Sequence, residues 1–117
     1  MKVSQKDNDY TPTELKSNVL VTHLERNLKD VHQLRRKLNS YNCEPQTYSL
    51  FERIESLKIG IETLIRTDQE IITALKERKK SAKEYIERVK QLYSEFNKLQ
   101  QGVEEYMGLT HSRRIHG

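Results

Sequence analysis

Apolar residues recur at helical spacing along the first third of the chain. Leucine and valine recur at intervals of four and three residues, and Asn27 interrupts their row. This spacing is typical of an amphipathic helix, so we predict a helix over residues 12–39. The row consists of Leu20, Leu24, Val31, Leu34 and Leu38, and it is widened by Val21 and Leu28.

The expected start of this helix carries a capping signal. Thr11 supplies a hydroxyl at the N-cap, Pro12 occupies the first helical position and Glu14 the third. Proline loses nothing there, because that backbone N–H has no helical partner. The threonine and glutamate side chains can satisfy two free N–H groups reciprocally. Residues 1–10 are polar and mixed in charge, and we expect them to form a disordered lead.

A second segment, residues 46–107, keeps a strict seven-residue repeat. Positions spaced by four and three from Leu50 form a row that we call the seam, and only Asp68 and Arg78 in it are charged. A 3.5-residue repeat sustained over about eight heptads indicates a coiled coil. The seam is Leu50, Ile54, Leu57, Ile61, Leu64, Asp68, Ile71, Leu75, Arg78, Ala82, Tyr85, Val89, Leu92, Phe96, Leu99, Val103 and Tyr106.

A second apolar row beside the seam favours a bundle of three or four helices over a two-stranded coil. This row contains Phe51, Ile65, Ile72, Ile86, Tyr93 and Met107.

These patterns predict an all-α fold, for which two architectures are open. The favoured one is an elongated helical hairpin or coiled coil, in which one helix of about 90 Å covers residues 46–107. The alternative is a three-helix bundle with a break near residues 76–81, where Ser81 and Glu84 match a capping box. The continuous helix is favoured because the segment contains no Gly, Pro or Asn and the seam resumes in register beyond it.

The domain organisation follows from the same patterns. Residues 11–107 form the predicted helical domain, and a loop at residues 40–45 joins its helices. Gly108 marks its expected end, and residues 108–117 are expected to be a flexible basic tail containing Arg113 and Arg114.

In the favoured hairpin, the first helix covers the long helix only to about residue 75. The distal seam then has no cover inside the chain, and we expect other helical protein subunits to bury it. The wide apolar surface favours a hetero-oligomer over a homodimer. Aromatic side chains are concentrated in this half, as in many protein interfaces. The predicted interface residues are Tyr85, Ile86, Val89, Leu92, Tyr93, Phe96, Leu99, Val103 and Tyr106.

Composition supports long helices rather than a thick globular core. Apolar residues make up 34% and charged residues 32% of the chain, against about 45–50% and about 25% in average soluble domains. The net charge is +4, and the excess lies in residues 76–90. A basic patch of Lys76, Lys79, Lys80 and Lys83 could bind a polyanion, such as nucleic acid, a microtubule or an anionic membrane surface. The favoured interpretation is a solvated helix face with interspersed glutamates.

Two interpretations of the charged seam residues Asp68 and Arg78 are equally open. Each could extend its charged end into water from the edge of the seam. Alternatively, they could fix the register or the choice of partner, as polar residues do in coiled coils.

We find no pattern that predicts catalysis. A single cysteine, Cys43, excludes an internal disulfide, and no two of the four histidines have the four-residue spacing of a helical metal site. No glycine-rich phosphate loop is present. We therefore expect no enzyme activity, metal, cofactor or small-molecule substrate.

The chain is expected to be an intracellular protein, cytoplasmic or nuclear. No segment is apolar enough to span a membrane, and the first ten residues lack the apolar stretch of a signal peptide. The sequence thus favours a non-enzymatic assembly subunit of a multiprotein complex. The alternatives are a polyanion-binding helical module and a self-contained three-helix docking domain.

Overall fold

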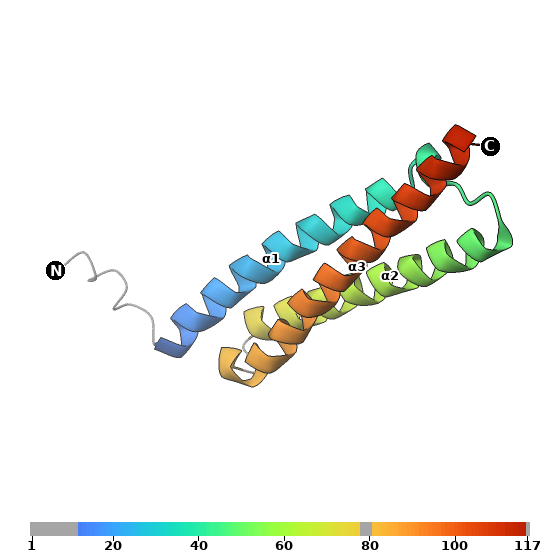
Figure 1. Cartoon of the computed structure of the whole chain (residues 1–117). Helices are drawn as coiled ribbons and strands as arrows, with labels where there is room; N and C mark the ends of the chain where they lie inside the picture. Colours follow the sequence, from blue (N-terminus) through green and yellow to red (C-terminus); the bar gives the residue numbers. More distant parts are fainter. Residues whose placement is uncertain (1–11, 78–80, 117) are drawn as a thin grey trace.

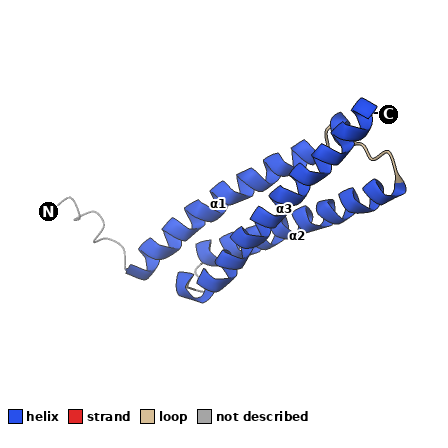
Figure 2. Cartoon of the chain, viewed as in Figure 1, coloured by secondary structure: helices blue, strands red, loops and turns tan. Residues whose placement is uncertain are grey.

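A computed structural model shows three long helices packed side by side (Figure 1). It describes the backbone of residues 12–77 and 81–116 and the side chains of residues 16–40, 42–77 and 81–111. The elements are α1 (Pro12–Leu38), a short 3₁₀ turn η2 (Tyr41–Cys43), α2 (Tyr48–Lys76) and α3 (Ala82–His116). The described backbone contains no strand, as Figure 2 shows.

The chain reverses direction twice, so α1 and α3 run parallel and α2 runs antiparallel to both (Figure 1). The molecule is elongated and measures 65 × 28 × 19 Å. The all-α prediction is therefore confirmed, and the first helix ends within one residue of its predicted boundary.

The single helix favoured for residues 46–107 is wrong, and the three-helix alternative is correct. α2 ends at Lys76 and α3 begins at Ala82, on the two sides of the predicted break. Leu75 and Ala82, which flank this break, are both buried. Reversing the chain here lets the distal seam be buried by the other two helices. That burial outweighs the helix propensity of residues 76–81.

Local hydrogen bonds define the starts of α2 and α3. The Thr47 hydroxyl accepts a hydrogen bond from the Leu50 N–H at 3.1 Å, as an N-cap side chain does. At the start of α3, the Ser81 N–H donates to the Glu84 carboxylate at 3.3 Å. This is one half of the capping box proposed from the sequence. The predicted cap at Thr11 lies outside the described residues.

The core runs along the axis between the three helices. Leu24, Ile61 and Val103, one from each helix, are fully buried. Every seam position whose burial the structure describes is buried or half-buried, whereas Arg78 lies outside the described residues. The seven-residue repeat therefore marks the residues that α2 and α3 direct into a shared core.

α2 and α3 approach each other closely at two glycines. A Cβ atom on Gly60 would lie 2.8 Å from Leu99 Cδ2, and one on Gly102 would lie 2.9 Å from Leu57 Cδ2. Each helix thus offers one leucine and one glycine three residues apart, and each leucine packs over the glycine opposite. This pairing lets two backbones lie close together.

The C-terminal boundary was also predicted wrongly. Residues 108–116 continue α3 instead of forming a separate tail. Thr110 is buried, and its hydroxyl donates to the Met107 carbonyl at 3.0 Å. Gly108 is therefore an interior helix residue. The predicted lead, residues 1–10, lies outside the described residues.

Candidate interaction groove

Three recesses follow one another along the junction between α1 and α3, and we call them together the α1/α3 groove. The first recess, of about 330 Å³, is lined by Lys16, Val19, Leu20, Ala82 and Ile86. The central recess, of about 240 Å³, is lined by His23, Arg26, Asn27, Asp30 and Tyr93. The third, of about 430 Å³, is lined by Asp30, Gln33, Leu34, Lys37, Phe96 and Gln100.

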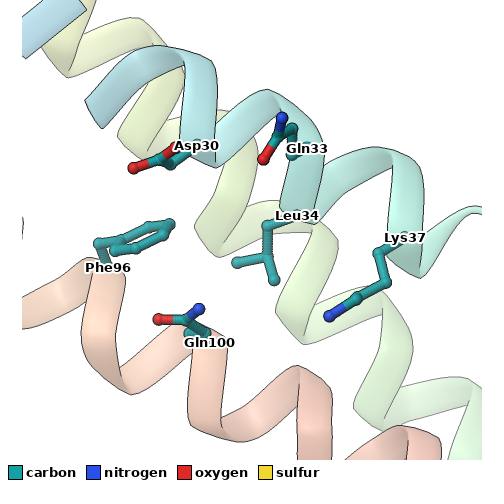
Figure 3. Close-up of a pocket in the computed structure, with 6 residues that line it drawn as sticks. All are labelled: Asp30, Gln33, Leu34, Lys37, Phe96 and Gln100. Atoms are coloured by element: carbon teal, nitrogen blue, oxygen red, sulfur yellow. The ribbon is translucent and has the colours of Figure 1, made fainter. Parts of the chain in front are cut away.

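Apolar side chains line both ends of this groove. In the first recess, Val19 is 55% exposed and Ile86 is 40% exposed. In the third recess, Leu34 and Phe96 point into the space between the two helices (Figure 3). Leu34 is buried and Phe96 half-buried, so Val19 and Ile86 are the exposed apolar side chains of the groove. Exposed apolar side chains in a recess are the usual anchor points of a protein interface.

Four polar residues of α1 follow the groove at intervals of seven. Lys16, His23, Asp30 and Lys37 each line at least one recess, and we call them the α1 row. Three heptads on an α-helix advance about 32 Å along its axis, so the row extends over most of α1. The sequence analysis missed this row because it followed only apolar periodicity. The seven-residue spacing of the polar residues was the available signal.

Ion pairs between helices all involve α2 among the described side chains. They join α2 to α1 twice and to α3 once, whereas none joins α1 to α3. The edges of the groove are therefore not tied together by charge. The pairs are Arg35–Glu62 at 2.9 Å, Lys76–Glu25 at 2.9 Å and Arg53–Glu105 at 2.7 Å.

Two buried polar residues lie close to the central recess: Asn27 lines it, and Asp68 acts on Tyr93, which also lines it. Asn27 of α1 is 7% exposed and Asp68 of α2 is fully buried. The Asn27 Oδ1 atom and both Asp68 carboxylate oxygens form no hydrogen bond with any described atom. Buried polar atoms without partners are costly and are uncommon in folded proteins. The idea that Asp68 extends into water is therefore wrong, and its role in register or partner choice stays a prediction.

The charge of Asp68 acts on a residue of the groove. Burial raises the pKa of Asp68 from 3.8 to about 7. The pKa of Tyr93, which lines the central recess, is raised by burial first and then by the charge of Asp68, while Arg26 acts in the opposite direction. The central recess therefore lies within the field of a buried carboxyl group.

The predicted interface residues divide into three groups. Ile86, Tyr93 and Phe96 line the α1/α3 groove. Tyr85 and Leu99 are half-buried in packing against the core. The distal seam is covered by the chain's own helices, so the expectation that it lacks an internal partner is wrong. The core residues of this set are Val89, Leu92, Val103 and Tyr106.

The predicted basic patch is described only in part. Lys76 pairs with Glu25 of α1, and Lys83 is exposed. Lys79 and Lys80 lie outside the described residues, and polyanion binding stays a prediction.

The described part of the chain contains no group of three or more His, Cys, Asp or Glu residues placed to hold a metal ion. Cys43 is buried, and its Sγ donates to the Lys37 carbonyl at 3.3 Å. No described helix is both long and apolar enough to cross a membrane.

Comparison with known proteins gives no relative from which a function could be transferred. No protein-family model, curated protein or solved structure matches this chain.

Proposed function

We propose that this chain is a non-enzymatic assembly subunit, a three-helix docking module that binds a helix of another protein in the α1/α3 groove. The observation that carries the proposal is the apolar lining of the first recess, where Val19 and Ile86 are both exposed. A fourth helix lying between α1 and α3 would bury these side chains and complete a four-helix bundle.

The way the three helices pack supports this proposal. α2 faces both neighbours through ion pairs and through the close glycine contacts with α3. The α1–α3 junction instead holds three open recesses in line. An amphipathic helix laid into a groove between two helices is a common mode of peptide recognition.

The proposal keeps the assembly function expected from the sequence but moves the binding surface. The seam residues serve the chain's own fold, and the partner surface lies on the groove at their edge. Hetero-oligomeric assembly remains part of the proposal.

The first test is the native size of the chain in a gentle extract of the cells that produce it. An assembly subunit elutes well above its own 13.9 kDa mass, and the Ile86→Asp variant returns to the free size. Ile59→Asp is the matched control, because Ile59 is an exposed isoleucine on α2, 66% exposed and outside the groove.

Elution of the wild-type chain as a free monomer in such extracts would overturn the proposed function. Circular dichroism of both purified variants establishes that each remains folded. Loss of the large form in the Ile59→Asp variant alone would place the partner surface on α2 instead.

A further inference from the structure

The charges along the α1/α3 groove restrict what can bind there. The α1 row presents Lys16 at one end, Lys37 at the other and Asp30 between them. Residues at the flanks of a helix–helix contact set partner choice through opposite charges at heptad spacing. A helix lying along this row therefore needs a complementary row at the same spacing.

A second copy of the chain does not satisfy this requirement through its own α1 row. In an antiparallel pair of rows, His23 of each copy meets Asp30 of the other, but Lys16 of one copy meets Lys37 of the other at both ends. In a parallel pair, each residue meets its own counterpart, so Asp30 meets Asp30. Like charges placed opposite each other are unfavourable. The row therefore favours a helix from a different protein.

The centre of the groove offers an acidic side chain to a partner. Asp30 is exposed and forms no ion pair or hydrogen bond with the described side chains. Asn27 lines the same recess, and its buried Oδ1 atom has no partner. Asp68 is fully buried and lines none of the recesses, so Asp30 is the acceptor that a partner can reach. Its carboxylate suits a cationic donor, because hydrogen bonds between charged groups are the stronger ones.

Arg26 also lines this recess, and its positive charge repels a partner's cation. It lies one helical turn before Asp30, on the side toward Lys16. A cation at Asp30 is therefore drawn to the carboxylate and away from Arg26. Asp30 also lines the third recess, together with Gln33, Leu34 and Lys37 (Figure 3).

We propose that the groove binds an amphipathic helix of a different protein whose contacting row is acidic, variable, basic and acidic at seven-residue intervals, facing Lys16, His23, Asp30 and Lys37 in that order. The proposal rests on the assembly function above. An antiparallel partner carries the same row in reverse order. Lys16 and Lys37 are 21 positions apart, so the contacting helix needs about 22 residues, or about 32 Å. Its apolar residues pack on Val19 and Ile86 at one end and on the half-buried Phe96 at the other.

The experiment uses the full purified chain and a displayed library of helices about 22 residues long. Apolar anchor positions are held as leucine, and the four row positions are varied among Glu, Gln, Lys and Arg. Selection should enrich helices with Glu at both ends and Lys or Arg at one interior row position. Enrichment of basic ends, enrichment of an acidic or neutral interior, or failure to enrich any binder would overturn the proposal.

A charge exchange tests the central contact directly. The Asp30→Lys variant should bind the selected helix about tenfold more weakly. A second helix carries Glu in place of the central basic residue. It should bind Asp30→Lys almost as strongly as the selected helix binds the wild type, and it should bind the wild type weakly. Such recovery cannot come from a folding defect. Equal loss with both helices would overturn the contact at Asp30.

The outcomes separate this proposal from the function on which it rests. If the native chain elutes in a large complex that Ile86→Asp disrupts, assembly through the groove stands even when the selected row differs. Ile59→Asp should bind the selected helix as well as the wild type does. If this control loses binding, the helix occupies another face and the charge pattern is wrong.

Discussion

The Tyr106 hydroxyl donates a hydrogen bond to the Cys43 carbonyl at 2.7 Å, joining the last third of α3 to the turn after α1. Both residues are buried. The contact spans 63 positions of sequence, and it fixes the C-terminal end of α3 against η2. Tyr106 is thus both a core residue and a closing contact for the bundle.

Removing this hydroxyl should destabilise the fold. Tyr106→Phe keeps the ring but leaves the buried Cys43 carbonyl without this donor, so we expect a loss of about 1–2 kcal/mol in the free energy of unfolding. Urea unfolding followed by circular dichroism measures it. Tyr85→Phe is the matched control because Tyr85 is only half-buried. Equal effects for the two variants would mean that the Tyr106 bond contributes little.

The buried carboxyl of Asp68 should make stability depend on pH. Its pKa is about 7 in the folded chain against 3.8 for an ordinary aspartate. Between these values the folded state binds more protons than the unfolded state, so stability falls as pH rises from about 4 to about 7. The raised pKa corresponds to a change on the order of 4 kcal/mol in the free energy of unfolding. The charged or titratable groups at the adjoining recess are His23, Arg26, Asp30 and Tyr93.

Asp68→Asn isolates this contribution, because it keeps the side-chain shape and removes the titration. At pH 8 the variant should be more stable than the wild type, and near pH 4 the difference should vanish. Unfolding in urea across this range provides the measurement. Glu70→Gln, a change at an exposed α2 carboxylate, should leave the wild-type slope unchanged. Parallel pH profiles for wild type and Asp68→Asn would contradict the assignment.

Helix content and the core could be predicted from the sequence, because the apolar rows directly record which faces are buried. The break after Lys76 could not be decided from local signals. Ser81 and Glu84 indicated a helix start, while the absence of Gly and Pro argued for continuity. Only burial of the distal seam by the other helices decides between them, and that is a tertiary effect. Gly108 misled for a similar reason, since glycine is tolerated within a helix that packing holds in place.

The groove was only partly predictable. Ile86, Tyr93 and Phe96 were expected at an interface because they are apolar and aromatic. The contribution of α1 was missed, because the assumed hairpin gave α1 no contact with the distal half. Lys16 and Asp30 become neighbours of Ile86 and Phe96 only once the chain reverses a second time.

Two glycines of the bundle should respond differently to alanine. Gly108 has open space around it, so Gly108→Ala should stabilise the chain by about 0.5–1 kcal/mol through helix propensity. A Cβ on Gly60 meets Leu99 at 2.8 Å. Gly60→Ala should therefore gain less or lose stability, because Leu99 must rotate away. Thermal unfolding of both variants measures the two changes in stability. A larger gain in stability for Gly60→Ala than for Gly108→Ala would contradict the close contact.

The α1 row also predicts how the chain can be made to pair with itself. Lys37→Glu places an acid at one end, so two antiparallel copies would align Lys16 of each copy with the new carboxylate of the other. Each end then changes from repulsion to an ion pair worth up to about 1 kcal/mol. We expect concentration-dependent dimers, with association strengthened about tenfold or more. Sedimentation equilibrium at low salt provides the measurement.

The matched control is Lys29→Glu, which makes the same charge change at an exposed α1 position that lines none of the three recesses. It should remain monomeric like the wild type. Added salt should dissociate the Lys37→Glu dimer, because screening weakens exposed ion pairs. If both variants associate equally, the lower net charge is the cause. If neither associates, two copies of the α1 row do not approach closely enough for their charges to decide pairing.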